Sequence, residues 1–365
     1  MRIVAVEPVL VEVPLRETVT GVHGSIPVQR SALVRVRADG GAEGWGDVDP
    51  TAGYSVMSAA DVVDTVRRLA PRLVGLDATN LHGALRVMDG EAPGRHEALA
   101  AVEMALCDLT ARAAGWPLWR LLGGRVKDRL TFNAWIGTVP PEQAAREALG
   151  WAARGFKSAK IKVDGAAPAG IDRVAAVRAA VGDRLALRVD FNESLDAAEA
   201  VPFIRRLEPF GLTLVEQPVP RDQVPALAEI RRRIGVPLMA DESVSGPASL
   251  IDIIRREAAD IVKVKVMKQG GLLRTRQMVE TAAAAGLAVV IGHGFGLTLS
   301  TLAEAAVAAT SEAVMDGCES VGPLKMAGDV VVEPVRLDHG VLDLPDTPGL
   351  GAVVDPDAVE RYRAA

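Results

Sequence analysis

Seven ionisable residues recur along the chain at steps of 24 to 28 residues, and most of them close or directly follow a short apolar run. They are Lys162, Asp190, Glu216, Asp241, Lys265, His293 and Glu319. Such a period indicates one β-strand and one helix per step, which places the residues at equivalent positions of a repeated βα unit. In a barrel of parallel strands, the carboxyl ends of the strands carry the chemistry.

Three of these residues are acids on consecutive units: Asp190, Glu216 and Asp241. Two carboxylates about 4 Å apart repel by about 4 kcal/mol at an effective dielectric of about 20, so three converging carboxylates need a cation. Lysines could supply this positive charge, and a divalent metal ion is the other source. Hard oxygen ligands without a His or Cys cluster favour Mg²⁺, with Mn²⁺ as the alternative, and argue against zinc. The competing interpretation is that the three acids are unrelated helix N-caps.

Lysines stand on both sides of the acids in the sequence. Lys160 and Lys162 alternate along one run, so they share a face of the predicted strand. Like charge and partial burial lower the pKa of a lysine, which makes Lys162 a candidate base, although a solvated edge strand is the alternative. Lys265 ends the run 260–265, nearly across the barrel, and Lys263 on the same face is expected to pair with a buried carboxylate.

Two opposed lysines beside a divalent cation favour one kind of chemistry, the removal of a proton α to a carboxylate. The cation would bind the substrate oxygens and stabilise the enediolate, since preorganised charge at a developing oxyanion is usually the largest catalytic contribution.

The elements that must position these residues form an α/β pattern. From residue 130 onwards, short apolar runs alternate with Ala-rich amphipathic segments, which predicts a closed barrel of eight βα units. We expect strands at 131–136, 158–162, 185–190, 212–216, 237–240, 260–265, 287–291 and 313–317. We expect helices to begin near Pro141, Pro168, Asp196, Asp222, Pro247, Gly271 and Thr298.

The first part of the chain has a different pattern. Residues 3–13 and 31–38 and the segment 43–47 predict antiparallel strands, residues 16–30 a long loop, and residues 58–73 and 95–114 helices. Residues 330–344 predict antiparallel strand again. We therefore divide the chain into an N-terminal domain (1–127), a barrel (128–324) and a tail (325–365) that packs on the first domain.

Composition excludes several classes of function. The chain has 365 residues and a formal net charge of −6 without a block of Lys or Arg, which argues against nucleic-acid binding and for a small-molecule partner. No segment approaches about 18 consecutive apolar residues and the start lacks a signal-peptide core, so we expect a cytoplasmic protein without a membrane span. Cys107 and Cys318 are expected to be small buried thiols without a disulfide.

A group of short motifs resembles the enolase superfamily, in its mandelate racemase and muconate lactonizing enzyme branch. The motifs are Gly44–Asp47, Leu121–Gly124, Lys160–Lys162, Asp190–Glu193, Glu216–Pro218, Asp241–Ser243, Lys265 with Gly270 and Gly271, and Pro348–Gly351. The resemblance covers nearly the whole chain. It implies an α+β capping domain over a (β/α)7β barrel and a homo-oligomer, either a dimer or an octamer.

The resemblance also assigns roles to residues. It implies that Asp190, Glu216 and Asp241 bind Mg²⁺, that Lys162 and Lys265 are the two acid/base residues, and that Lys160 tunes its neighbour and polarises the substrate carboxylate. In having a lysine, Lys265, after the sixth predicted strand, the chain resembles the lactonizing-enzyme subgroup. The same resemblance places Asn192 and Glu242 at polar positions next to the ligands.

The remaining site residues are implied to contact the substrate. Mandelate racemases hold a catalytic histidine at the place of His293, but its partner position is here Lys265, so a substrate contact or a barrel-end hydrogen bond is expected instead. Glu319 lies where family members contact the substrate or an oxyanion, with a salt bridge as the alternative. Capping-domain loops close over the barrel, here around His23 to Ile26 and near Tyr54.

These observations lead to four functional hypotheses for a small carboxylate substrate. The first is a racemase or epimerase of an amino or cyclic imino acid of the proline type, because lysines on both faces can return the proton to either side. The second is a dehydratase of a β-hydroxy acid such as a hydroxyproline or a sugar acid. Cycloisomerisation is the third, and a non-catalytic carboxylate sensor is the fourth.

Overall fold

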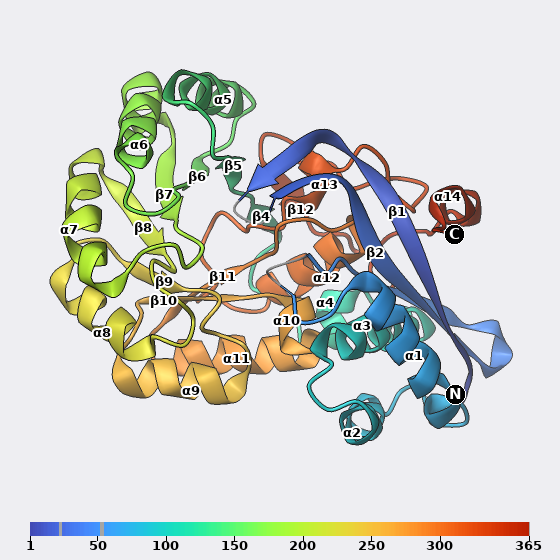
Figure 1. Ribbon diagram of the computed structural model, residues 1–365. Helices are drawn as coiled ribbons and strands as arrows, with labels where there is room; N and C mark the ends of the chain where they lie inside the picture. Colours follow the sequence, from blue (N-terminus) through green and yellow to red (C-terminus); the bar gives the residue numbers. More distant parts are fainter. Residues whose placement is uncertain (22–23, 52–54, 365) are drawn as a thin grey trace.

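The computed structural model describes residues 1–21, 24–51 and 55–364 and contains an α/β barrel and an α+β domain side by side (Figure 1). Seven parallel strands of the barrel lie in chain order in one curled sheet. They are β5 (Ala134–Ile136), β6 (Ser158–Lys162), β7 (Ala186–Asp190), β8 (Leu212–Glu216), β9 (Leu238–Ala240), β10 (Ile261–Val264) and β11 (Ala288–Ile291). Each lies within its predicted run, so the barrel prediction is confirmed for these seven strands.

The predicted eighth strand, 313–317, is wrong as a continuous strand. The segment makes one bridge to β11, between Val289 and Val314, and one on its other side, between Phe132 and Cys318. Gly317 has a φ of 83°, which interrupts the extended backbone between the two bridges. The segment therefore completes the (β/α)7β barrel through two isolated bridges instead of a full ladder.

Helices cover the outside of the barrel sheet (Figure 1). They are α5 (Pro141–Ala153), α6 (Pro168–Val181), α7 (Ala197–Leu207), α8 (Val224–Arg233), α9 (Pro247–Arg256), the short α10 (Val266–Gln269), α11 (Leu272–Ala284) and α12 (Thr298–Ala308). Four of them carry Pro in the first turn, where its missing N–H has no partner to lose. The predicted helix starts are confirmed to within two residues.

The N-terminal domain is an antiparallel sheet of β1 (Ile3–Gly21), β2 (Gly24–Ala38) and β3 (Glu43–Val48), packed against α1 (Ala59–Leu73), α2 (Leu81–Glu91) and α3 (His96–Ala113). Close packing of β3 on α3 explains the Gly44–Asp47 motif, because a Cβ at Gly46 would overlap the carbonyl oxygen of Ala101. Short helical segments are α4 (Leu118–Leu121), η1 (Asp39–Gly41), η2 (Gly182–Arg184) and η3 (Glu208–Phe210).

The predicted loop over residues 16–30 is wrong, because β1 and β2 continue through this region as a long hairpin. Its pairing is irregular between Pro14 and Val19, where the register shifts. Pro27 and Val28 are both exposed, so burial does not alternate there as it does in a half-buried strand. Without that alternation, the sequence lacks the period of two by which a half-buried strand is recognised.

The barrel part of the chain ends in α13 (Gly322–Lys325), and the C-terminal tail contains β12 (Val341–Asp343) and α14 (Pro356–Tyr362). The antiparallel strand predicted over 330–344 is limited to β12, which pairs with β4 (Arg129–Thr131). The tail also contacts the N-terminal domain. Arg363 bridges to Val11, and the buried Asp108 accepts bonds from the backbone N–H groups of Trp45 (2.9 Å) and Leu350 (2.7 Å).

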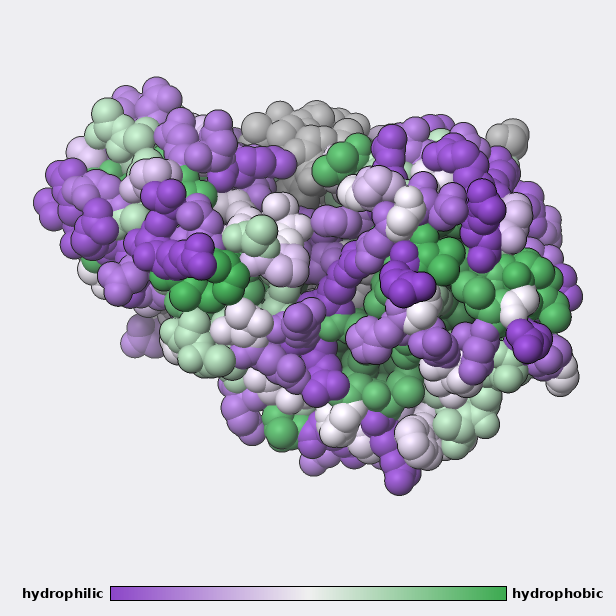
Figure 2. All heavy atoms as spheres, turned by 90° about the horizontal axis from the view of Figure 1, so that it is seen from below, coloured by the Kyte–Doolittle hydropathy of each residue, from purple (hydrophilic) through white to green (hydrophobic). Residues whose placement is uncertain are grey.

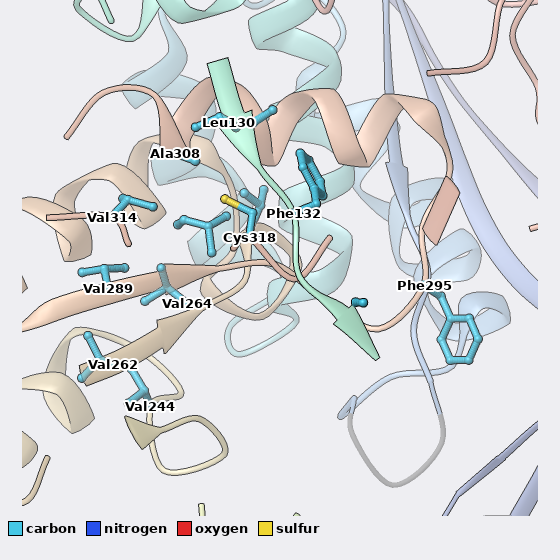
Figure 3. Close-up of a cluster of buried hydrophobic side chains, with 14 of the residues drawn as sticks. Leu130, Phe132, Val244, Val262, Val264, Val289, Phe295, Ala308, Val314 and Cys318 are labelled. Atoms are coloured by element: carbon cyan, nitrogen blue, oxygen red, sulfur yellow. The ribbon is translucent and has the colours of Figure 1, made fainter. Parts of the chain in front are cut away.

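Two apolar clusters lie close to the end of the barrel where the strands have their carboxyl ends. Inside the strands, Leu214, Met239, Ile261 and Val290 form one cluster, and the first three precede Glu216, Asp241 and Lys263 by two residues. Residues two apart share a face of a strand, so this cluster lies one layer deeper than the charged groups. Figure 3 shows a second cluster around Val262, Val264 and Val289 with Val314 and Cys318 of the closing segment. Both cysteines are free and buried, as predicted.

The surface differs between the two sides of the molecule. Hydrophilic residues predominate over the outer barrel helices at the left of Figure 2, whereas hydrophobic residues gather in patches on the side of the N-terminal domain. Val4, Val56 and Val74 are among the exposed hydrophobic residues of that domain. Within the described residues, no helix is long and apolar enough to cross a membrane.

Candidate active site

Asp190, Glu216 and Asp241 stand side by side at the carboxyl ends of β7, β8 and β9, and all three are 0% exposed. Asp190 and Glu216 end their strands as register partners, and Asp241 directly follows β9. The topology thus brings together the three acids predicted to converge. Burial and the negative charge of Asp190 raise the pKa of Glu216 to about 8, against the opposing effect of the nearby lysines.

The oxygens of these acids are in contact with ammonium groups. Lys162 and Lys160 lie 2.7 and 3.0 Å from Oδ2 of Asp190, and Lys265 lies 2.7 Å from Oδ2 of Asp241. Across the part of the chain that the structure describes, no three Asp, Glu, His or Cys side chains are grouped closely enough to hold one metal ion. The donor set nevertheless fits a divalent cation in its chemistry, since three buried carboxylates on neighbouring strands are hard oxygen ligands. Their role as metal ligands stays a prediction.

Lys162 and Lys265 lie at the two ends of this row of acids. Lys162 ends β6, beside β7, and Lys265 follows β10, beside β9, so three strands separate them. Lys162 donates to Oδ1 of Asn192 at 2.5 Å as well as to Asp190. Burial lowers the pKa of Lys265 to about 7, although Asp241 opposes this effect. A lysine with that pKa can accept and return a proton near neutral pH.

Glu319 forms ion pairs with two lysines that also contact Glu216. Its Oε2 lies 2.5 Å from Nζ of both Lys160 and Lys263, and the same two lysines lie 3.1 Å from the oxygens of Glu216. Arg188 contacts the other oxygen of Glu319 at 3.3 Å. The geometry favours the salt-bridge interpretation of Glu319, and it gives Lys263 the buried carboxylate partner expected from the sequence. Substrate contact by Glu319 stays a prediction.

His293 is enclosed between two buried acids. Its Nε2 lies 2.5 Å from Asp49 and its Nδ1 lies 2.8 Å from Glu304. Burial disfavours the charged ring, but the two carboxylates raise the pKa of His293 well above its usual value. Asp49 follows β3 of the N-terminal domain, so the histidine connects the two domains. A substrate contact at His293, which stays a prediction, would have to replace one of these partners.

Asn192 is hydrogen-bonded to both Glu242 and Asp190. The side-chain amide of Asn192 donates to Glu242 at 3.1 Å, and its backbone N–H donates to Asp190 at 2.9 Å. Burial and the charges of Asp241 and Asp190 raise the pKa of Glu242 to about 7. Asn192 thereby fixes the position of Lys162 relative to Asp190.

Two predicted substrate contacts, His23 and Tyr54, lie outside the described residues. Three basic residues near the site were not predicted: Arg188, Lys268 and Lys325. Lys268 lies 2.8 Å from Oδ1 of Asp241, and the only signal in the sequence is its place three residues after Lys265. Arg188 is predictable only by its alternation with Asp190 on the same strand.

Two protein-family models match the chain. The model described as "Mandelate racemase / muconate lactonizing enzyme, N-terminal domain" matches residues 2–123. The model described as "Enolase C-terminal domain-like" matches residues 143–358.

Individual relatives match over nearly their whole length. The chain is 33% identical to muconate cycloisomerase 1 of Rhodococcus opacus, over 99% of this chain and 98% of that one. It is 32% identical to the L-Ala-D/L-Glu epimerase of Bacillus subtilis, over 97% of both chains. Among solved structures, a dipeptide epimerase from Cytophaga hutchinsonii, complexed with Mg and the dipeptide D-Ala-L-Val, matches with a TM-score of 0.95 and 27% identity, over 100% of this chain and 99% of that one.

Proposed function

This chain belongs to the mandelate racemase and muconate lactonizing enzyme family of the enolase superfamily, and from this premise we propose that it is a racemase or epimerase of an amino or cyclic imino acid. The reaction is removal of the proton next to the substrate carboxylate and its return to the same carbon. As a member of this superfamily the chain is an enzyme, and isomerisation accords with the named activities of its relatives.

One observation carries the proposal, the placement of Lys162 and Lys265 at opposite ends of the row Asp190, Glu216 and Asp241. A substrate carbon held between the two lysines presents one face to each. If one lysine removes the proton and the other returns a proton to the opposite face, the configuration inverts. The ammonium that delivers a proton becomes the base for the reverse reaction, so the two lysines exchange roles.

The neighbouring residues prepare this step. Asn192 orients Lys162 through its 2.5 Å contact. Lys160 remains charged, because the carboxylates of Asp190, Glu216 and Glu319 outweigh burial and raise its pKa well above the usual value. That fixed positive charge attracts a substrate carboxylate and stabilises the charge that develops on it. Asp190, Glu216 and Asp241 would hold Mg²⁺, or Mn²⁺ as the alternative, and such an ion supplies further positive charge beside that carboxylate.

Cycloisomerisation is the second candidate, because a muconate cycloisomerase matches at 33% identity over nearly the whole chain. The same lysines would serve it, since a cycloisomerase also forms and protonates a carbanion next to a carboxylate. Run in the reverse direction, it would begin with the same proton removal. The two candidates therefore differ in the substrate and not in the lysines.

The test is incubation in D₂O with Mg²⁺ and a panel of amino acids, N-acylated amino acids, hydroxyprolines, dipeptides, sugar acids and muconate, followed by proton NMR. Racemisation or epimerisation predicts deuterium at Cα without loss of water. A lactone from muconate would establish the cycloisomerase instead, and an α-keto acid would establish a dehydratase. If no compound exchanges or reacts while carboxylates still bind, the protein is a sensor and the proposal is wrong.

A further inference from the structure

Glu103 is a buried acid of α3, in the N-terminal domain, that the reaction described above does not use. It is 1% exposed. Its two carboxylate oxygens accept hydrogen bonds from the backbone N–H groups of Leu272, at 2.7 Å, and Leu273, at 3.0 Å, which are the first two residues of α11. The first N–H groups of a helix have no partner within the helix. A side chain of one domain therefore caps a helix of the other.

The negative charge of Glu103 is compensated mainly by this helix. Among the residues that the structure describes, no Lys or Arg forms an ion pair with Glu103. Burial raises the pKa of Glu103 to about 7, whereas the N–H groups of Leu273 and Leu272 and, at longer range, Arg274 lower it. Above pH 7 the group is thus mainly ionised, as suits a carboxylate at the partly positive N-terminus of a helix.

This contact accounts for the pair Gly270 and Gly271, which the site chemistry leaves unexplained. Gly271 directly precedes α11 with a φ of 128°, and a Cβ there would lie 2.7 Å from Cδ of Glu103. Gly270 has a φ of 84°, which residues with a side chain also rarely adopt. The two glycines let the chain turn into α11 while the carboxylate approaches its backbone.

The short helix α10 lies between this turn and the catalytic Lys265, which is its N-cap residue. A helix of four residues is not stable without packing. Its support is α3, which lies beside it (Figure 1). Met267 belongs to the apolar cluster of the N-terminal domain, and Nδ1 of His96 lies 3.1 Å from the carbonyl oxygen of Lys268. His96 and Glu103 are seven residues apart, so one face of α3 contacts both α10 and the start of α11.

A backbone hydrogen bond connects the capped turn to the position next to Lys265. The N–H of Gly271 donates to the carbonyl oxygen of Val266 at 3.0 Å, and Val266 directly follows Lys265. A shift of the start of α11 would therefore move the backbone that carries the lysine.

We propose that Glu103 is a positioning residue for Lys265, because by capping α11 across the domain interface it holds the segment 265–271 in place. This inference rests on the proposed function, which assigns one of the two proton transfers to Lys265. Lys162 ends β6, at the other end of the row of acids. Loss of the Glu103 carboxylate should therefore affect the two lysines unequally.

Two measurements test this without a substrate, on Glu103→Ala at pH 8. In hydrogen–deuterium exchange followed by mass spectrometry, residues 265–275 should exchange roughly tenfold faster or more, relative to residues 158–165 around Lys162, because two hydrogen bonds to a charged group are lost. In labelling with acetic anhydride, the buried Lys265 should react several-fold faster relative to the exposed Lys157.

Asp108→Ala is the matched control. Asp108 is also a buried acid of α3 that accepts two backbone N–H bonds, but from Trp45 and Leu350 and not from α11. It should leave both ratios as in wild type. Glu103→Gln keeps one oxygen as an acceptor and should restore most of the protection. If Glu103→Ala does not fold, Glu103→Gln should show a smaller change in the same direction.

The third measurement uses a substrate found in D₂O. Glu103→Ala should slow Cα exchange of the enantiomer that depends on Lys265 about 10- to 100-fold more than that of the other, because small displacements of a catalytic group have effects of this size. Unchanged exchange and labelling of residues 265–275 overturn the inference, as does an equal loss for both enantiomers. Absence of Cα exchange in wild type is failure of the proposed function, and the first two measurements then still decide whether Glu103 positions Lys265.

Discussion

Nε2 of His293 lies 2.5 Å from Oδ1 of Asp49, and this contact joins the barrel to the N-terminal domain. His293 follows β11 and Asp49 follows β3, and both residues are buried. Glu304 on α12 contacts the other ring nitrogen and accepts a hydrogen bond from the hydroxyl of Ser320. One charged imidazole therefore compensates two buried carboxylates from two domains.

Replacement of His293 by leucine should destabilise the protein by about 3–5 kcal/mol, because it leaves Asp49 and Glu304 buried without a cation. Urea denaturation at pH 7 measures the free energy of unfolding. His82→Leu is a matched control, since this second histidine is exposed on α2. If His293 is instead a substrate contact, His293→Leu would raise KM and leave the free energy of unfolding unchanged.

Much of the site could be predicted from local sequence, because its residues terminate buried apolar runs. Asp190 and Glu216 each follow a short apolar run, which predicts a buried strand of a sheet. The nearly constant spacing of the βα units then predicts that both residues lie at the same end of the barrel. Lys162 was found in the same way. These predictions needed only the position of a residue within its own strand.

The contacts between distant elements could not be predicted in this way. The pairing of His293 with Asp49 joins residues 244 positions apart, and nothing near either residue indicates the other. Lys325 lies in an irregular segment after the closing bridges, where no periodicity places a side chain. The long hairpin could not be predicted because burial does not alternate along its described part, where Pro27 and Val28 are both exposed, and alternating burial is what produces the period of two.

The two catalytic lysines should affect the two enantiomers of a substrate differently. Because Lys162 and Lys265 face opposite sides of the substrate carbon, Lys162→Ala should remove deuterium exchange from one enantiomer and Lys265→Ala from the other. The expected loss is about 10²- to 10⁴-fold in the affected exchange rate. Proton NMR of each pure enantiomer in D₂O measures it.

A matched control is Lys157→Ala, which is exposed on the barrel surface and should leave both exchange rates unchanged. Equal loss for both enantiomers in each catalytic variant would contradict the placement of the lysines on opposite faces. It would indicate that a single lysine performs both proton transfers.

Removal of divalent cations should abolish exchange, and Mg²⁺ should restore it. A second measurement does not depend on activity. If Asp190, Glu216 and Asp241 bind the ion in the folded state alone, Mg²⁺ at about 100 times its dissociation constant stabilises the protein by about 2.7 kcal/mol. Thermal unfolding with and without Mg²⁺ detects this, and Asp241→Asn should lose most of the shift.

Asp343→Asn is the control for that experiment, because its carboxylate is exposed on β12 and should leave the shift intact. Turnover that persists after exhaustive chelation, together with no stabilisation by Mg²⁺, would exclude the predicted metal site. The five lysines in contact with these acids would then be their permanent partners.

Asp47, in the Gly44–Asp47 motif, should make the stability of the protein depend on pH. It is 0% exposed, and its Oδ2 accepts bonds from the hydroxyl of Ser300 at 2.7 Å and the N–H of Leu297 at 3.2 Å, both in the barrel. Burial, with a further effect from Asp49, raises its pKa to about 7, whereas the unfolded chain titrates at 3.8. The protonated form thus stabilises the folded state fully below 3.8, and this contribution disappears as pH rises through 7.

Asp47→Asn is neutral at every pH, so the comparison with wild type isolates the titration. A difference of about three pKa units corresponds to about 4 kcal/mol. About 2.5 units of that difference lie above pH 4.5, so the free energy of unfolding of wild type, relative to Asp47→Asn, should fall by about 3 kcal/mol between pH 4.5 and pH 8 in urea denaturation. Asp64→Asn, which removes an exposed carboxylate from α1, is the control for the loss of one negative charge. A rise with pH would mean that the folded protein holds Asp47 ionised, and that the contact between the two domains is stabilised by the charge itself.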